Sequence, residues 1–314
     1  MGNPKISVII PVYNTEDYVA QAVESIMLQT LQDIEIILIN DGSTDHSQEI
    51  MEELARKDCR IQVHSQENHG QSVARNHGIQ YASGKYFYFM DSDDLLELNA
   101  LEICFNKCES NQLDFVFFDA SILQSKGQIN MGLSYTRTNA TDEQKVYTGS
   151  DVLNILLSRH VYSASPCLNV IRADFFHRIP LDFYPRIIHE DELFTFKLYL
   201  YAGRTMAIHR AFYIRRIRQN STMTQTFKWK NMHGYLTVAE EISKLRKGAN
   251  KEIKKTIDSF LTKMLNAAMW KGHVLSKKKR IYLFYISMTK YKKYLTTRTL
   301  ITLLFKSSIP VKKS

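Results

Sequence analysis

The sequence predicts an α/β fold in which a mainly parallel sheet is flanked by helices, with a basic helical extension at the C-terminal end. Three observations predict it. Short apolar runs alternate with helical patterns over the first 120 residues, polar clusters follow several of those runs, and basic residues accumulate towards the end of the chain. With 314 residues, 44% of them hydrophobic, the chain can bury a substantial core.

Five short runs are apolar almost throughout and rich in β-branched or aromatic residues. Such runs are typical of strands that are covered on both faces, as in parallel sheets. The runs are ISVIIPVY at 6–13, IEIILIN at 34–40, RIQVH at 60–64, KYFYFM at 85–90 and DFVFFD at 114–119.

Helical patterns lie between these runs. The first begins near Thr15, a candidate N-cap that is followed by two acids. A second follows the turn at 41–44, a third extends from about Gly70 to Gly84, and a fourth covers roughly 99–109. In the fourth, Cys104 and Cys108 lie one turn apart and are expected to pack in the core rather than to bind metal. This alternation predicts right-handed crossovers between parallel strands.

Three polar clusters come directly after predicted strands, at 11–14, 40–42 and 91–93. Ligands of open α/β sheets bind beyond the carboxyl ends of the strands, so we expect the clusters to converge on one rim. The third cluster gathers the carboxylates of Asp91, Asp93 and Asp94. These repel one another unless a cation neutralises them, and oxygen ligands on a short turn suit Mg²⁺ or Mn²⁺. The alternative is a solvated turn in which Asp94 caps the next helix.

Five motifs in order resemble glycosyltransferase family 2: SVIIPVYN, INDGSTD, GQSVARNHGI, YFYFMDSDD and HEDELF. The resemblance covers roughly residues 6–222 and implies the GT-A fold, a Rossmann-like sheet flanked by helices. We therefore expect a nucleotide-sugar glycosyltransferase domain at 1–226 and a basic helical region at 227–314. A dehydrogenase is disfavoured because the first strand ends in PVYN rather than G-x-G-x-x-G, and a sugar-nucleotide pyrophosphorylase because the glycine-rich, arginine-bearing loop is absent.

The resemblance assigns roles to residues at the first three motifs. Pro11, Tyr13 and Asn14 look like a wall of the nucleotide pocket. Asp41 resembles the aspartate that accepts the N3–H of uracil, although it also fits an ordinary acid at a helix start. Arg75 resembles the arginine that lines the nucleotide site, whereas the helical pattern alone would make it an exposed charge.

The fourth motif and the segment 209–221 are expected to hold the diphosphate. By resemblance, Asp91, Ser92 and Asp93 form the D-x-D motif, in which Asp93 holds Mn²⁺ or Mg²⁺ and Asp91 contacts the ribose or the metal. The segment 209–221 resembles the part of the family that closes over the donor phosphates. Arginine there could neutralise the departing diphosphate, and Arg216 is our choice among the arginines at 215, 216 and 218.

The fifth motif supplies the expected catalytic acids. The segment HEDEL at 189–193 is not the zinc-binding motif of a metalloprotease, because H-E-x-x-H requires a histidine at the position of Leu193. The resemblance makes Asp191, with Glu190 beside it, the general base that takes the proton from the acceptor hydroxyl. The alternative is that either acid only caps the following helix.

The C-terminal region carries the basic charge. From Ile242 to Ser314 there are 19 Lys or Arg against two acids, a net charge of +17, which leaves −8 for residues 1–241 of a chain of net charge +9. Its segments interleave cations with apolar residues and are too interrupted to span a membrane. They fit helices on an anionic membrane surface, or an ordinary helical subdomain with a solvated basic face. Nucleic-acid binding is disfavoured because no recognition motif accompanies the charge.

The sequence thus predicts an inverting, metal-dependent glycosyltransferase. It would move a sugar from a nucleotide donor, most simply a UDP-sugar, to a glycan or polyprenyl-linked acceptor in cell-surface polysaccharide synthesis. The four scattered cysteines, and an amino terminus in which Pro11 breaks the apolar run, indicate a cytoplasmic protein. The basic C-terminal region and the family resemblance together imply a peripheral location at the inner face of the cell membrane. The rival is a catalytically silent scaffold or membrane-surface binding module of the same fold.

Overall fold

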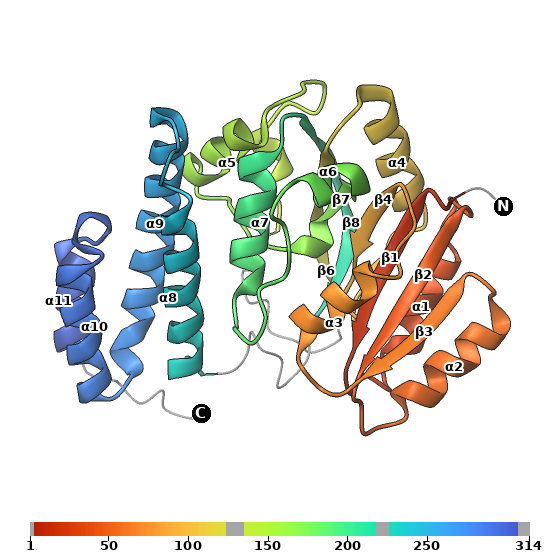
Figure 1. The fold of residues 1–314 in the computed structure, drawn as a ribbon, viewed down its shortest axis with the longest axis horizontal. Helices are drawn as coiled ribbons and strands as arrows, with labels where there is room; N and C mark the ends of the chain where they lie inside the picture. Colours follow the sequence, from red (N-terminus) through yellow and green to blue (C-terminus); the bar gives the residue numbers. More distant parts are fainter. Residues whose placement is uncertain (1–2, 124–134, 218–225, 307–314) are drawn as a thin grey trace. The chain divides into compact units, whose positions relative to one another are not determined.

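The structure is a computed structural model that describes residues 3–123, 135–217 and 226–306 (Figure 1). The chain divides into two compact units. The first comprises residues 1–186 and 194–218, and the second comprises residues 187–193 and 219–314. The domain boundary expected at residue 226 stays a prediction, since compactness alone does not define a domain that folds independently.

The first unit is built on one eight-stranded sheet, which confirms the predicted fold class. Its strand order is β3-β2-β1-β4-β7-β6-β8-β5, and β3, β2, β1 and β4 are parallel neighbours. The strands are β1 (Ile6–Val12), β2 (Ile34–Asp41), β3 (Ile61–Gln66), β4 (Tyr86–Phe89), β5 (Leu95–Leu96), β6 (Phe115–Leu123), β7 (Asn169–Arg172) and β8 (Thr205–Arg216).

The sheet departs from the predicted parallel alternation at β7, and also at its edge, where β5 pairs antiparallel with β8. β6 does not lie beside β4, because β7 inserts between them and pairs antiparallel with both. Beyond it, β6 and β8 are parallel again. β7 is a run of four residues, NVIR, too short to mark a strand or to specify its neighbours by periodicity.

Helices cover both faces of the parallel part of the sheet. Side chains of α1 and α2 share one core cluster with Val8, Ile10 and Leu38. On the opposite face α3 approaches so closely that a Cβ on its Gly78 would meet Ile9 at 2.5 Å. The helices of this unit are α1 (Val19–Met27), α2 (Ser47–Lys57), α3 (Gln71–Ile79), α4 (Ala100–Asn111), α5 (Gly149–Ser158), α6 (Ala173–Arg178) and most of α7 (Glu190–Tyr201).

Two predicted helix limits need correction. The first helix starts at Val19 rather than near Thr15, because residues 15–18 form a turn and the Thr15 side chain does not cap the helix. α3 ends at Ile79 rather than at Gly84. Gly84 instead lies against β1, where a Cβ would be 2.5 Å from the Ser7 nitrogen. Cys104 and Cys108 are buried in the core, as expected.

From Trp229 to Phe305 the second unit is mainly helical, which confirms the predicted helical C-terminal region. Met232, Met269, Leu283 and Leu303 are buried in its apolar core. In the part of the chain that the structure describes, we find no helix with the length and apolar character to cross a membrane. The helices are α8 (Trp229–Lys244), α9 (Lys251–Lys271), α10 (Lys277–Thr289) and α11 (Thr297–Phe305).

Candidate active site

The loops that follow β1, β2 and β4 are tied together at one rim of the sheet, which confirms the predicted convergence. Asn14 adopts a left-handed backbone with φ of 49°, and its amide N–H donates to Ser43 Oγ at 3.2 Å. The Asn14 side-chain oxygen accepts from the Thr44 N–H at 2.8 Å. Thr15 Oγ1 donates to Ser92 Oγ at 3.0 Å, which joins the first loop to the D-x-D turn.

Pro11 is buried near the end of β1, and Tyr13 just beyond it is 48% exposed. Ile9 is the last β1 residue that pairs with β4, and its carbonyl accepts from the Met90 N–H at 3.1 Å. The missing N–H of Pro11 therefore falls where β4 has already ended, so the proline removes no ladder bond there. This early end of β4 lets the chain turn into Asp91–Asp94 beside β1.

Asp41, at the end of β2, is only 2% exposed and holds the loop before α3. Its Oδ1 accepts from the His69 N–H at 2.9 Å and from Gln66 Nε2 at 2.7 Å, and its Oδ2 accepts from the Gly70 N–H at 2.8 Å. It does not cap α2, which begins six residues later at Ser47. A carboxylate offers about four acceptor positions, so the three hydrogen bonds leave capacity for one further donor.

Arg75 is buried rather than exposed, and it pairs with the D-x-D turn. Its side chain is 3% exposed, and Nη2 lies 2.7 Å from Asp91 Oδ1. The guanidinium also lies over the Phe183 ring, 5.1 Å from its centroid. The Asp91 side chain is 33% exposed, so this carboxylate is anchored by Arg75 and still reaches solvent.

Asp94 is held from the other side, by β8. It is 2% exposed, its Oδ2 accepts from the Tyr213 hydroxyl at 2.7 Å, and its Oδ1 accepts from the Arg216 N–H at 2.6 Å. Burial, followed by the charges of Asp91 and Asp93, raises the pKa of Asp94 to about 7. The alternative that Asp94 caps the next helix is wrong, because α4 begins only at Ala100. Two features thus allow the three acids to lie close together. Arg75 pairs with Asp91, and Asp94 is buried with a raised pKa, while Asp93 lies between them in the sequence.

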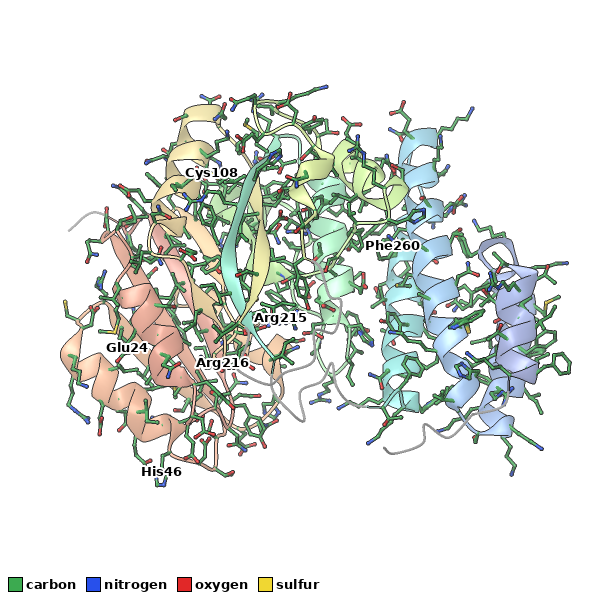
Figure 2. All side chains as sticks on the ribbon, turned by 180° about the vertical axis from the view of Figure 1, so that it is seen from behind. Glu24, His46, Cys108, Arg215, Arg216 and Phe260 are labelled. Atoms are coloured by element: carbon green, nitrogen blue, oxygen red, sulfur yellow. The ribbon has the colours of Figure 1, made fainter. Side chains whose placement is uncertain are left out.

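Arg215 and Arg216, labelled in Figure 2, end β8 and have different hydrogen-bond partners. Arg216 Nε donates to the Asp93 carbonyl at 3.0 Å, and its guanidinium lies 5.0 Å from the centre of the Tyr18 ring. Arg215 Nη1 donates to the Tyr135 hydroxyl at 3.1 Å. Arg216 therefore contacts the backbone of the D-x-D turn directly, whereas Arg215 is held by Tyr135 and feels the charges of Asp91 and Asp94.

Other members of the predicted phosphate segment are placed elsewhere or fall outside the described residues. His209 Nε2 lies 2.9 Å from the Thr141 carbonyl oxygen, and the main-chain N–H of His209 donates to Glu143 Oε2 at 3.1 Å. Arg218 and Ser221 lie outside the part that the structure describes.

The D-x-D turn carries the carboxylates of Asp91 and Asp93, groups of the kind that bind hard cations. Within the described residues, no group of three or more His, Cys, Asp or Glu is arranged to hold a metal ion. Two carboxylates on one turn fit the usual Mg²⁺ or Mn²⁺ arrangement, in which water and substrate phosphates supply the other ligands. A cation here would thus depend on the nucleotide diphosphate for much of its coordination.

In the second unit, the acids of the fifth motif open α7. Glu190, Asp191 and Glu192 form its first turn, where negative charge is stabilised by the helix dipole. Glu190 is 3% exposed, and Asp191 Oδ1 accepts from the Glu192 N–H at 2.9 Å. His189 enters this turn with a left-handed φ of 72°.

Sequence reasoning missed the residues of α8 that support this turn. The His189 ring stacks on Tyr235 with centroids 3.9 Å apart, and burial, followed by the charge of Lys271, lowers the pKa of His189 to about 4. Beside Tyr235, Gly234 lies so close to the chain that a Cβ would be 1.9 Å from the Ile188 carbonyl oxygen. The signal was a glycine inside an otherwise regular helical pattern, which often marks a close backbone approach.

Gly234→Ala is therefore expected to lower the free energy of unfolding by about 1–3 kcal/mol, the usual cost of forcing extra atoms into a packed site. Urea unfolding followed by circular dichroism measures this change. Gly203→Ala is a matched control, because its Cβ would lie 3.5 Å from Asp114 Oδ2, an ordinary contact. Equal stabilities of the two variants would show that α8 and the Ile188 backbone do not pack as described.

Comparison with known proteins identifies related sequences. The family model described as glycosyl transferase family 2 matches residues 7–155. Glycosyltransferase GlyG of Streptococcus pneumoniae serotype 4 is 32% identical over 228 residues, which cover 71% of this chain and 74% of GlyG. Glycosyltransferase GlyA of the same organism is 33% identical over 246 residues, 76% of this chain, but the match spans only about a third of its length, 34%.

Solved structures share the fold. S. aureus TarS in complex with UDP-GlcNAc superposes with a TM-score of 0.68 over 92% of this chain and 89% of the TarS chain, at 21% identity. The mannosyltransferase PcManGT from Pyrobaculum calidifontis, in complex with GDP-Man and Mn²⁺, gives a TM-score of 0.59 at 13% identity, over 92% of this chain and 76% of the other. At these identities the likeness establishes the fold of this chain and no more.

Proposed function

The chain belongs to glycosyltransferase family 2, and from this we propose that it is an inverting, metal-dependent enzyme that transfers a sugar from a nucleotide donor to a glycan acceptor. One observation carries the proposal: Asp41, the Arg75–Asp91 pair and Asp93 meet at the carboxyl rim of the parallel strands. That rim is where open α/β sheets bind nucleotides.

The proposed donor is a UDP-sugar. The acceptor capacity left on the buried Asp41 carboxylate suits one imide N–H, such as N3–H of uracil, and the fold neighbour TarS is seen with UDP-GlcNAc. Pro11, Tyr13 and Asn14 would form the wall beside the base. We propose a hexosyl or N-acetylhexosaminyl group as the sugar.

The residues present fit a divalent cation held between protein and diphosphate. Asp93 would be its principal protein ligand, with Asp91 next to it, while Ser92 is fixed by Thr15 and shapes the turn. When bound, Mn²⁺ or Mg²⁺ would neutralise charge that develops on the departing diphosphate. Arg216, already on the Asp93 carbonyl, would add a fixed positive charge from β8.

The proposed reaction is a single displacement. The acceptor oxygen forms a bond to the anomeric carbon, the bond from that carbon to the phosphate oxygen breaks, and the nucleoside diphosphate leaves with its electron pair. Asp191 takes the acceptor proton, and Glu190 supports it from the same helical turn. Attack opposite to the leaving group inverts the anomeric centre, so an α-linked donor gives a β-linked product.

We propose a glycan or polyprenyl-linked glycan as the acceptor, in synthesis of a cell-surface polysaccharide. Such an acceptor would place the reaction in the cytoplasm, at the inner face of the cell membrane. The apolar and basic composition of the C-terminal region supports this setting.

A panel of UDP- and GDP-sugars with purified protein and Mn²⁺, scored for release of the nucleoside diphosphate, tests the proposal. Release from one donor supports the transferase and names the sugar. Absence of both release and Mn²⁺-dependent nucleotide binding would favour the silent scaffold. Glycan acceptors are included in the assay, so that a slow rate of donor hydrolysis does not conceal the transfer.

A further inference from the structure

Helix α10 is apolar on two opposite sides. One side is buried in the second unit through Leu283 and Ser287. The other side is exposed, although four large apolar residues form it. At about 100° per residue these four fall within an arc of roughly 120° that faces away from Leu283. They are Ile281 at 64%, Tyr282 at 51%, Tyr285 at 64% and Met288 at 39% exposed.

Lysines at the start of α10 border this exposed stripe. Lys277, Lys278 and Lys279 occupy the first turn, which contains no acid, and all three are exposed. Positive charge at a helix N-terminus is opposed by the helix dipole, so helix stability does not account for these residues. Lys277 and Lys278 lie one turn before Ile281 and Tyr282, on the same side of the helix.

The neighbouring helix α11 also exposes large apolar residues, and it is fixed to α10. The buried Arg280 of α10 donates from Nε to the Leu303 carbonyl at 2.6 Å and from Nη2 to the Lys306 carbonyl at 3.1 Å, at the end of α11. On α11, Ile301 is 53% exposed and Phe305 is 77% exposed. These apolar side chains therefore belong to well-packed helices whose inner faces are already buried.

We propose that α10 and the end of α11 seat this unit on an anionic membrane surface. The apolar stripe would enter the interfacial layer of the lipid while the lysines bind lipid phosphates, as amphipathic helices do when they lie in the plane of a membrane. The net charge of +17 over residues 242–314 makes a second copy of the same face an unfavourable partner, because two such surfaces repel. An anionic surface satisfies both the charge and the apolar stripe.

Co-sedimentation of the full chain with vesicles tests the proposal, in the absence of any nucleotide sugar. Vesicles of phosphatidylcholine alone are compared with vesicles that also contain phosphatidylglycerol, at low and high salt. We expect binding to the anionic vesicles that weakens with salt. A failure to bind them, or equal binding to both kinds of vesicle, would overturn the proposal without bearing on the transferase chemistry.

Two double variants locate the surface on α10. Lys277→Glu with Lys278→Glu is expected to lower the vesicle partition coefficient about 25-fold or more, since each lysine near an anionic surface contributes about fivefold. The matched control is Lys251→Glu with Lys255→Glu, which makes the same charge change at the start of α9, also on exposed residues. An equal loss in the control would mean that only the net charge matters, and the assignment to α10 would be wrong.

The apolar contribution is tested separately. Ile281→Ser with Tyr285→Ser should reduce binding to anionic vesicles at least tenfold, whereas Leu28→Ser with Leu98→Ser, at exposed apolar positions of the first unit, should leave it unchanged. All eight positions substituted in α10 and in the controls are exposed, and unchanged thermal unfolding verifies the fold. A concentration-dependent dimer that Tyr285→Ser converts to a monomer, with no vesicle binding, would identify a second copy as the partner instead.

Discussion

Asp93→Ala is expected to lower metal-dependent release of nucleoside diphosphate from the preferred donor about a thousandfold or more. Asp93 is the proposed principal ligand of the cation, and a metal ion stabilises a departing diphosphate by several kcal/mol, with each 1.4 kcal/mol worth a factor of ten in rate. Arg75 and Arg216 remain in the variant, but Arg75 is committed to Asp91 and Arg216 to the Asp93 backbone. Neither arginine is placed to replace the cation.

The substitution is well suited to the test because it leaves a structural contact intact. Arg216 Nε donates to the main-chain carbonyl of residue 93, which alanine retains. Initial rates with Mn²⁺ are measured together with titration of the nucleotide in the presence and absence of Mn²⁺. Asp17→Asn, at an exposed position of the loop before α1, is the control and should behave as the wild type. Turnover that persists in Asp93→Ala with the same response to Mn²⁺ would refute the assignment of this ligand.

The sequence was sufficient to predict the convergence of the site because a general rule applies to it. Parallel strands end at a common rim, so residues that follow β1, β2 and β4 must meet. Helix limits were less predictable, since a side chain that could cap a helix can instead form a hydrogen bond with a residue far along the chain. Thr15 is a good N-cap by type, yet its hydroxyl donates to Ser92, which lies 77 positions along the chain.

Burial of charge was the feature that local patterns could not reveal. Arg75 lies on a short helix with one buried side, and its burial depends on Asp91 and on the ring of Phe183. Asp94 similarly depends on Tyr213, 119 positions away, for its hydrogen-bond donor. Periodicity describes one element at a time, whereas these contacts join α3 to the turn after β4 and join that turn to β8.

The packing around the first turn of α7 also comes from residues distant in the sequence. Gly234 and Tyr235 of α8 lie more than 40 positions after Asp191 and carry no motif of their own. The family resemblance predicted Asp191 and Glu190 as catalytic acids, but it gave no reason for the left-handed backbone conformation of His189 before them. In the structure that reason is packing, because the His189 ring stacks on Tyr235 while Gly234 admits the Ile188 carbonyl.

Asp191→Asn is expected to lower kcat by a factor of about 10²–10⁴ while the affinity for the donor nucleotide is unchanged. This is the usual range for loss of a general base, and asparagine cannot take the acceptor proton. Asparagine preserves the side-chain oxygen that accepts from the Glu192 N–H, so the first turn of α7 should persist. Turnover with the preferred donor and a saturating acceptor gives kcat, and nucleotide titration gives the affinity.

Glu190→Gln and Glu192→Gln make the assignment specific, because all three acids occupy the same helical turn. Each removes one negative charge at that helix start, as Asp191→Asn does, so an effect of charge alone would appear equally in the three variants. We expect the largest loss in Asp191→Asn, a smaller loss in Glu190→Gln and near wild-type kcat in Glu192→Gln. If Glu190→Gln instead lost most of the turnover while Asp191→Asn retained it, Glu190 would be the general base. Asp191 would then only stabilise the first turn of α7.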